Sequence, residues 1–261
     1  MKMNHLLSII IYSCWKNRDM WEIFSQLFSK YWPDCPCPVV LVTDKYRKNG
    51  GGGDNYVFDQ IIQKDDTWAK MIKEAIVQVK TPYVSLWMDD YLLCDYVKNQ
   101  DIERYLETAV KYHAANMRLI ESPVCKERWK NHKDLGFYQP GTAYSLSTQP
   151  GIWDSRFLLE IIDDQWSAWD FERIASLEKR NWKQPLLVAL DYMFPYEEGV
   201  RKGKWMLQGA KLCKINGIHP DTSVRPIMSN WEMAKIYLKG AILDWNATLI
   251  VRLQNLLNFW H

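Results

Sequence analysis

Two continuous apolar runs of strand length, separated by one amphipathic segment, constrain the fold of this 261-residue chain most strongly. The runs are Leu6 to Tyr12 and Pro38 to Thr43. Strands that are apolar at nearly every position are typical of parallel strands covered on both faces. Between them, residues 19–31 carry apolar side chains at helical spacing, and Pro33 stops the helix. This order predicts a βαβ unit, which closes right-handed.

The alternation of strand and helix continues down the chain. A second helix is expected to start at Trp68, with Thr67 as its cap, and to end at Thr81-Pro82. The further expected elements are strands at 83–88, 117–120, 144–147 and 186–192, helices at 102–113, 153–162 and 168–179, and a mainly helical tail over 229–261. Asn49 to Asp54, with its four glycines, is expected to be a mobile loop. The fold class is therefore α/β, a Rossmann-like, mostly parallel central sheet flanked by helices.

Composition excludes several classes of protein. Hydrophobic residues make up 48% and charged residues 25%, as in globular domains. The net charge is only +2 and its carriers are spread along the chain, which argues against a nucleic-acid partner. The sequence contains no apolar stretch of about 18 residues, so no membrane-spanning helix is expected. The apolar run near the N-terminus, Leu6 to Ile11, is short for the apolar core of a signal sequence. No linker rich enough to divide the chain is present, so one domain over residues 1–261 is expected.

The six cysteines form no CxxC pair, and reduced thiols in the cytoplasm are the expectation. Cys35-Pro-Cys37 is interpreted as part of a loop, and the alternative is a metal site completed by distant residues. The chain also holds 14 Trp and 14 Tyr. Such a load fills a core or lines a binding surface for sugars, whose apolar faces pack on aromatic rings.

Asp89 and Asp90 directly follow the expected strand at 83–88. Open α/β sheets bind ligands at the carboxyl ends of their strands. Carboxylates there can hold a divalent cation, Mn²⁺ or Mg²⁺, which bridges the oxygens of a nucleoside diphosphate. Solvated loop acids are the alternative. Adjacent side chains on an extended strand point to opposite faces, but the turn at the strand's end can bring one acid onto the metal and leave the other for the ribose.

Several separated segments resemble a bacterial family of GT-A-fold glycosyltransferases that build surface polysaccharides, such as capsule and lipopolysaccharide. The segments are Tyr12-Ser13-Cys14, the stretch from Leu27 to Pro36, Trp68, Met88-Asp89-Asp90-Tyr91, residues 145–153, residues 168–172 and Gly203-Lys204-Trp205. The resemblance covers most of residues 7 to 210. It implies a GT-A-like fold, with a nucleotide-sugar-binding half over about 1–120, an acceptor and catalytic half over about 121–228, and C-terminal helices over about 229–261. The Asp-Asp-Tyr segment lacks the intervening residue of the Asp-x-Asp metal motif.

The resemblance also implies site residues. Ser13, Asp44, Trp68 and Asp89 are expected near the donor nucleoside, and Asp89 with Asp90 at the metal. Core packing is the alternative for Trp68. Lys204 or His219 is a candidate for the leaving diphosphate, with an ordinary surface role as the alternative.

The transfer reaction needs a carboxylate that takes the proton of the acceptor hydroxyl. Glu172 is the first candidate and Asp170 the second, because Ser167-x-x-Asp170 also reads as a capping box. Gln149 and Trp153 are candidates for binding the acceptor sugar, with a capping Gln and a buried Trp as the alternative.

The leading hypothesis is an inverting glycosyltransferase that moves a sugar from a nucleotide-diphosphate donor to a saccharide acceptor, free or lipid-linked. A retaining transferase and a non-catalytic sugar- or nucleotide-binding protein are the rivals, and a glycosidase ranks lower.

Leu249 to Trp260 forms an apolar stripe with Arg252 as its only charged residue. The stripe packs on its own domain, or it holds a cytoplasmic protein at the inner face of the membrane. The donor sugar, its nucleotide, the linkage and the oligomeric state are not encoded in any pattern that we find.

Overall fold

The computed structural model describes residues 2–47, 56–177, 182–236 and 238. The chain divides into two compact units, residues 1–197 and 198–261. The glycine-rich segment at 49–54 and residues 239–261, which include the apolar stripe of the tail, lie outside the described residues. Residues 178 and 179 of the helix expected at 168–179 lie outside them as well.

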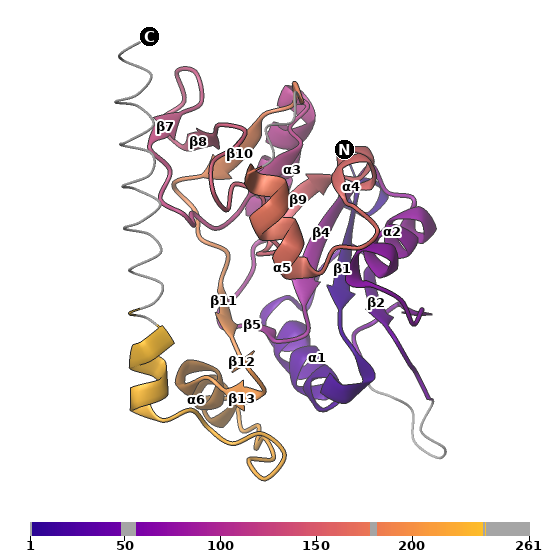
Figure 1. Ribbon diagram of the computed structural model, residues 1–261, viewed down its shortest axis with the longest axis vertical. Helices are drawn as coiled ribbons and strands as arrows, with labels where there is room; N and C mark the ends of the chain where they lie inside the picture. The colour runs from indigo at the N-terminus through magenta and orange to yellow at the C-terminus, as the bar shows by residue number, and fades with distance from the viewer. Residues whose placement is uncertain (1, 48–55, 178–181, 237, 239–261) are drawn as a thin grey trace. The chain divides into compact units, whose positions relative to one another are not determined.

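The first unit is built on a nine-stranded sheet of order β3-β2-β1-β4-β9-β6-β10-β8-β7 (Figure 1). Its strands are β1 Leu7–Tyr12, β2 Val39–Thr43, β3 Gln60–Gln63, β4 Tyr83–Met88, β6 Asn116–Arg118, β7 Glu127–Arg128, β8 Leu135–Tyr138, β9 Gly151–Asp154 and β10 Leu186–Ala189. Neighbours β3, β2, β1 and β4 are parallel, and so are β6 and β10. Strand β9 runs antiparallel to both β4 and β6, and β8 runs antiparallel to β10. The sheet is therefore mostly parallel, which confirms the predicted α/β class.

Helices connect these strands in the predicted order. They are α1 Asp19–Tyr31, α2 Trp68–Val79, α3 Asn99–Tyr112, α4 Ser155–Ile161 and α5 Ala168–Asp170, which continues as a π-helix over Phe171–Ala175. Short 3₁₀ turns at Met3–His5 and Trp15–Asn17 and a small sheet of β5 Tyr91–Leu93 with β11 Tyr196–Glu198 complete the order up to the boundary of this unit. Thr67 caps α2 as predicted, since its hydroxyl accepts the N–H of Lys70 at 3.3 Å.

Alternate residues of the strands supply two cores, one on each face of the sheet. Val84 and Leu86 of β4 join a cluster with α2, α4 and the π-helix. Trp87 of β4 faces the other way and packs against Phe24 and Phe28 of α1, with ring centroids 6.2 and 5.9 Å apart. Burial on both faces explains why these strands read as continuous apolar runs.

The strand predicted at 144–147 is wrong. These residues form a turn in which Tyr144 has a positive φ of 58°. Several of their backbone groups bond to side chains instead of to a neighbouring strand. Leu146 exchanges hydrogen bonds with Ser176 through both its N–H and its carbonyl, at 2.9 and 3.2 Å. Tertiary hydrogen bonds therefore take the place of the strand-to-strand hydrogen bonds that the local pattern predicts.

The helix predicted at 153–162 begins later than expected. Residues 151–154 form β9, and the helix α4 starts at Ser155. The carboxylate of Asp154 accepts the N–H of Phe157 at 2.8 Å and so marks the true N-cap. Strands β3, β7 and β8 are not predicted by the local pattern, because each has four residues or fewer and carries little period-two signal.

The second unit contains the hairpin of β12 Val200–Arg201 with β13 Lys204–Trp205, the helix α6 Leu207–Ile215 and a helical stretch over 230–236. Met206, Met228 and Met233 form its small buried cluster. Lys204 pairs with Glu232 at 2.5 Å inside this unit. Across both units, the described helices include none with the length and apolarity that crossing a bilayer requires.

Candidate active site

The carboxyl ends of β1 and β4 meet through Ser13 and Asp89. The Ser13 hydroxyl donates a hydrogen bond to the Asp89 carboxylate and accepts one from the indole N–H of Trp21 at 2.7 Å. Ser13 and Asp89 are 1% and 5% exposed. The parallel register of β1 and β4 brings these two strand ends together. Asp89 is thus a fixed, buried acid on the face of the sheet that α1 covers.

Asp44 holds the end of β2 beside the same edge. Its carboxylate accepts the backbone N–H of Trp15 at 2.6 Å and the hydroxyl of Thr43 at 3.2 Å. Tyr12 lies between these acids. Burial, together with the nearby charges of Cys14, Asp44 and Asp89, raises the pKa of Tyr12 to about 12. The expected donor residues Ser13, Asp44 and Asp89 therefore share one edge.

Tyr91 links this edge to the helical segment that carries Glu172. Burial raises the pKa of Tyr91 well above its usual value, and the charges of Tyr196, Asp90 and Glu172 add to the effect. The rings of Tyr91 and Tyr196 lie 4.9 Å apart. Asp90 and Glu172, which are distant in sequence, thus both lie close enough to act on one phenol.

Glu172 is gripped through one carboxylate oxygen. Its Oε1 accepts hydrogen bonds from the Ser147 hydroxyl at 2.9 Å, the Thr148 N–H at 2.7 Å and the Thr148 hydroxyl at 2.9 Å. No described residue donates a hydrogen bond to its Oε2. Glu172 is half-buried and belongs to the π-helix, an element that occurs frequently at functional sites. The carboxylate is therefore fixed in orientation while one oxygen stays available.

The turn over 144–149, which grips Glu172, is itself held from the sheet by Arg118 at the end of β6. The guanidinium donates to the Tyr144 carbonyl at 2.7 Å, to Gln149 Oε1 at 3.1 Å and to the Ser122 carbonyl. It also lies 5.2 Å from the centre of the Tyr138 ring. The side-chain oxygen of Gln149 thus helps to hold the turn, and the expected acceptor role of Gln149 stays a prediction.

Sequence reasoning missed Arg118, although a signal was present. The residue is only 3% exposed, and burial lowers its pKa while nearby Tyr138 and Glu172 raise it. A charged side chain inside an apolar strand segment, Met117 to Ile120, is seldom buried without a reason. Tyr91, Ser147 and Thr148 lie in segments that carry the resemblance, but no spacing connects them with Glu172, because only tertiary contacts bring them together.

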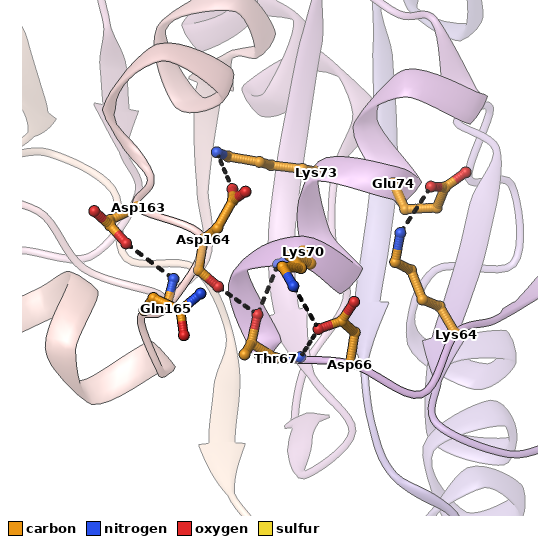
Figure 2. Close-up of polar contacts among 9 residues, drawn as sticks. All are labelled: Lys64, Asp66, Thr67, Lys70, Lys73, Glu74, Asp163, Asp164 and Gln165. Carbon is orange, nitrogen blue, oxygen red and sulfur yellow. Dashed lines mark hydrogen bonds and ion pairs between the residues drawn. The ribbon is translucent and has the colours of Figure 1, made fainter.

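The turn before α5 is attached to the start of α2 (Figure 2). The Thr67 hydroxyl donates to the Asp164 carbonyl at 2.6 Å, and Lys73 pairs with the Asp164 carboxylate at 2.5 Å. Exposed ion pairs of this kind contribute little to stability. The bond from Thr67 is the more informative contact, because one side chain both caps α2 and fixes the segment that leads into α5.

Asp170 forms the capping box that its spacing allowed. Its carboxylate accepts the N–H of Ser167 at 3.0 Å and the Ser167 hydroxyl at 2.6 Å, and these hydrogen bonds lower its pKa. The Ser167 hydroxyl in turn accepts the N–H of Asp170 at 3.2 Å. This geometry favours the capping alternative over a catalytic role for Asp170.

Two expected ligand-binding tryptophans belong to the core. Trp68 is 5% exposed and Trp153 is fully buried. Both pack on Phe171, with ring centroids 5.5 and 5.7 Å apart. A sugar cannot stack on a ring without an exposed face, so the structure favours core packing for Trp153 and for Trp68. Trp68 still has an indirect link to the site, because Phe171 precedes Glu172.

The remaining expectations concern the phosphate and the metal. Lys204 and His219 belong to the second unit, so a role at the sheet edge stays a prediction for both. Within the described ranges, no group of three or more His, Cys, Asp or Glu side chains is arranged to hold a metal ion. All six cysteines are free.

Neither a protein-family model nor a curated protein matches the sequence. Solved structures show weak likeness. The TarS 1–349 structure from S. aureus in complex with UDP-GlcNAc is 15% identical, with 77% of this chain and 60% of that chain covered and a TM-score of 0.43. A cytidylyltransferase from Leptospira borgpetersenii is 8% identical, with 86% and 99% covered and a TM-score of 0.48.

The bifunctional IspDF from Campylobacter jejuni is 14% identical, with 68% of this chain covered and a TM-score of 0.39. The present chain spans only 48% of that protein. At these identities and scores the likenesses assign no activity to the chain.

Proposed function

We propose that this protein is a glycosyltransferase that moves a sugar from a nucleotide-diphosphate donor to a saccharide acceptor. One observation carries the proposal. The carboxylate of Glu172 is held through Oε1 by Ser147 and Thr148, beside Tyr91 and the acidic end of β4. The carboxyl edge of an open α/β sheet is where such folds bind ligands.

Glu172 is assigned as the general base. A base must be oriented and must reach the proton it removes, at a heavy-atom distance of about 2.6–3.2 Å. Three hydrogen bonds on Oε1 provide the orientation. Oε2 is then the oxygen that takes the proton of the acceptor hydroxyl as that hydroxyl attacks the anomeric carbon. Attack from the side opposite the leaving group inverts the anomeric centre.

Ser13, Asp44 and Asp89 are assigned to the donor side. Their side chains form the rigid end of β1, β2 and β4, with the Asp89 carboxylate fixed by Ser13. Asp89 and Asp90 would hold a divalent cation, and their carboxylates are the hard oxygen donors that Mn²⁺ and Mg²⁺ accept. Two protein ligands suit a cation that also binds substrate phosphates. When bound, it stabilises the charge of the departing diphosphate.

The first experiment replaces the two assigned acids. Glu172→Gln should lower kcat by about 10²- to 10⁴-fold, the usual contribution of a general base, with little change in donor KM. Asp90→Asn should weaken donor binding and its response to Mn²⁺. Release of nucleoside diphosphate from a panel of UDP- and GDP-sugars measures both effects. Glu160→Gln and Asp65→Asn, which alter exposed acids elsewhere, are the matched controls.

The outcomes separate the rival functions. A protein whose melting temperature rises with UDP or GDP but which releases no product with any saccharide acceptor is a binding protein. A product with the donor's anomeric configuration, read by NMR, indicates a retaining transferase in which Glu172 only positions a substrate. Wild-type turnover in both acid variants would refute the assignments of Glu172 and Asp90.

A further inference from the structure

Trp169 is the exposed aromatic residue nearest in sequence to Glu172. It exposes 70% of its surface, whereas Trp68 and Trp153, which pack beneath the same helical segment, expose 5% and 0%. Within the described residues, Trp169 makes no ring-to-ring contact with another aromatic side chain. Single exposed apolar side chains are common on protein surfaces, so what distinguishes Trp169 is its position three residues before Glu172.

The backbone under Trp169 is rigid. Trp169 lies between Ser167 and Asp170, whose capping box closes the first turn of α5. Two residues later, Phe171 anchors the segment in the core against Trp68 and Trp153. The exposed indole thus stands on a support fixed from both sides, as a preorganised binding residue requires.

Trp169 and Glu172 are neighbours on one helical surface. The residues between them keep helical dihedrals, with φ and ψ of −67° and −40° at Asp170 and −56° and −48° at Phe171. Positions three apart on a helix have Cβ atoms roughly 5–6 Å apart. Helical side chains also lean toward the N-terminus, so Glu172 leans over the turn that begins with Trp169.

We propose that Trp169 is the stacking platform for the acceptor saccharide, an inference that rests on the proposed function. A hydroxyl that donates its proton to Glu172 belongs to a pyranose about one ring's width from the base. The apolar face of that ring then lies on the indole, and its hydroxyls point to the polar groups of the turn over 144–149. Trp169 thereby binds the acceptor sugar in place of Trp153, whose ring is buried.

Saccharide binding tests the proposal without relying on turnover. Saturation-transfer NMR is measured with the methyl β-glycosides of glucose, galactose and N-acetylglucosamine on the full chain. We expect signal from at least one glycoside, an affinity weaker by about fivefold or more in Trp169→Ala, and retention in Trp169→Phe, which keeps a stacking ring. Trp231→Ala is the matched control, because Trp231 is 69% exposed but belongs to the second unit.

Each other outcome has a defined meaning. No signal from any glycoside, or equal binding by Trp169→Ala, overturns the platform. Self-association that Trp169→Ala abolishes on size-exclusion chromatography also overturns it and assigns the indole to a protein interface. If saccharide binding depends on Trp169 but the protein transfers no sugar, the stacking role of Trp169 is supported and only the proposed catalysis is refuted. In an active enzyme, Trp169→Ala should raise acceptor KM and leave donor KM unchanged.

Discussion

At the scale of single residues, Arg118 contributes more to the candidate site than its sequence position suggests. Its guanidinium is buried, and its hydrogen bonds go to carbonyl oxygens of Tyr144, Ser122 and the Gln149 side chain. Two of those acceptors, on Tyr144 and Gln149, belong to the turn over 144–149, which grips Glu172. Lysine cannot reproduce this fork, because an ammonium group is a point charge on a flexible stem. Arg118 is thus a positioning residue for Glu172.

Arg118→Met is expected to destabilise the protein. The substitution keeps much of the apolar volume but leaves partly buried carbonyl oxygens without the donors that Arg118 supplies. A fully buried unpaired group costs about 1–3 kcal/mol, so we expect a total loss within about that range. The shift of the urea midpoint, followed by circular dichroism, measures the loss. Arg128→Met, at the exposed edge strand β7, is the control. Equal midpoints for the two variants would show that the carbonyls find other partners and that Arg118 is dispensable for this turn.

At the scale of secondary-structure elements, the segment that carries Glu172 is positioned from two sides. Ser176 binds Leu146 of the gripping turn, and Thr67 of α2 binds Asp164 ahead of α5. The π-helix lies between these attachments. A substitution at either attachment should therefore shift the position of the Glu172 carboxylate, although Glu172 itself is unchanged.

Thr67→Ala removes both the cap of α2 and the bond to the Asp164 carbonyl. We expect a loss of about 0.5–2 kcal/mol in the free energy of unfolding, the usual range for a lost N-cap. Thr67→Ser keeps the hydroxyl and should recover most of that loss. Chemical denaturation of the three proteins measures the difference. Equal stability of the alanine and serine variants would mean that neither hydrogen bond contributes.

At the scale of the whole molecule, buried phenols make the fold sensitive to alkali. Burial raises the pKa of Tyr12 and of Tyr138 to about 12, and the nearby charges act in the same direction at Tyr12. The folded state then keeps protons that the unfolded chain releases near pH 10. Stability from these residues is fully present below about pH 10 and is lost as pH rises toward 12.

The melting temperature is therefore expected to fall between about pH 10 and pH 12. Tyr12→Phe should make this fall shallower, because one proton-linked group is removed. Differential scanning fluorimetry at intervals of pH measures the slope. Tyr96→Phe, which removes an exposed phenol, is the matched control. An unchanged slope in Tyr12→Phe would contradict the role of Tyr12 in the alkaline transition.

Local patterns predicted much of the fold. Hydrophobic periodicity or a helix-breaking residue marks six elements along the chain, namely β1, β2, β4, α1, α2 and α3. These signals depend only on residues close together in the sequence. The position of Asp89 and Asp90 followed from the end of one such strand. The pattern failed at 144–147 and at 153, where long-range contacts decide whether a short apolar segment becomes a turn, a strand or a helix.

By itself, the sequence determined the α/β alternation and the acids at the strand ends, because both depend on neighbours close along the chain. Tertiary structure alone decided which tryptophans are covered, which carboxylate caps a helix, and that Glu172 reaches Ser147 and Thr148 beside Tyr91. Those outcomes depend on segments far apart in the chain meeting at the edge of one sheet. No local spacing encodes such a meeting.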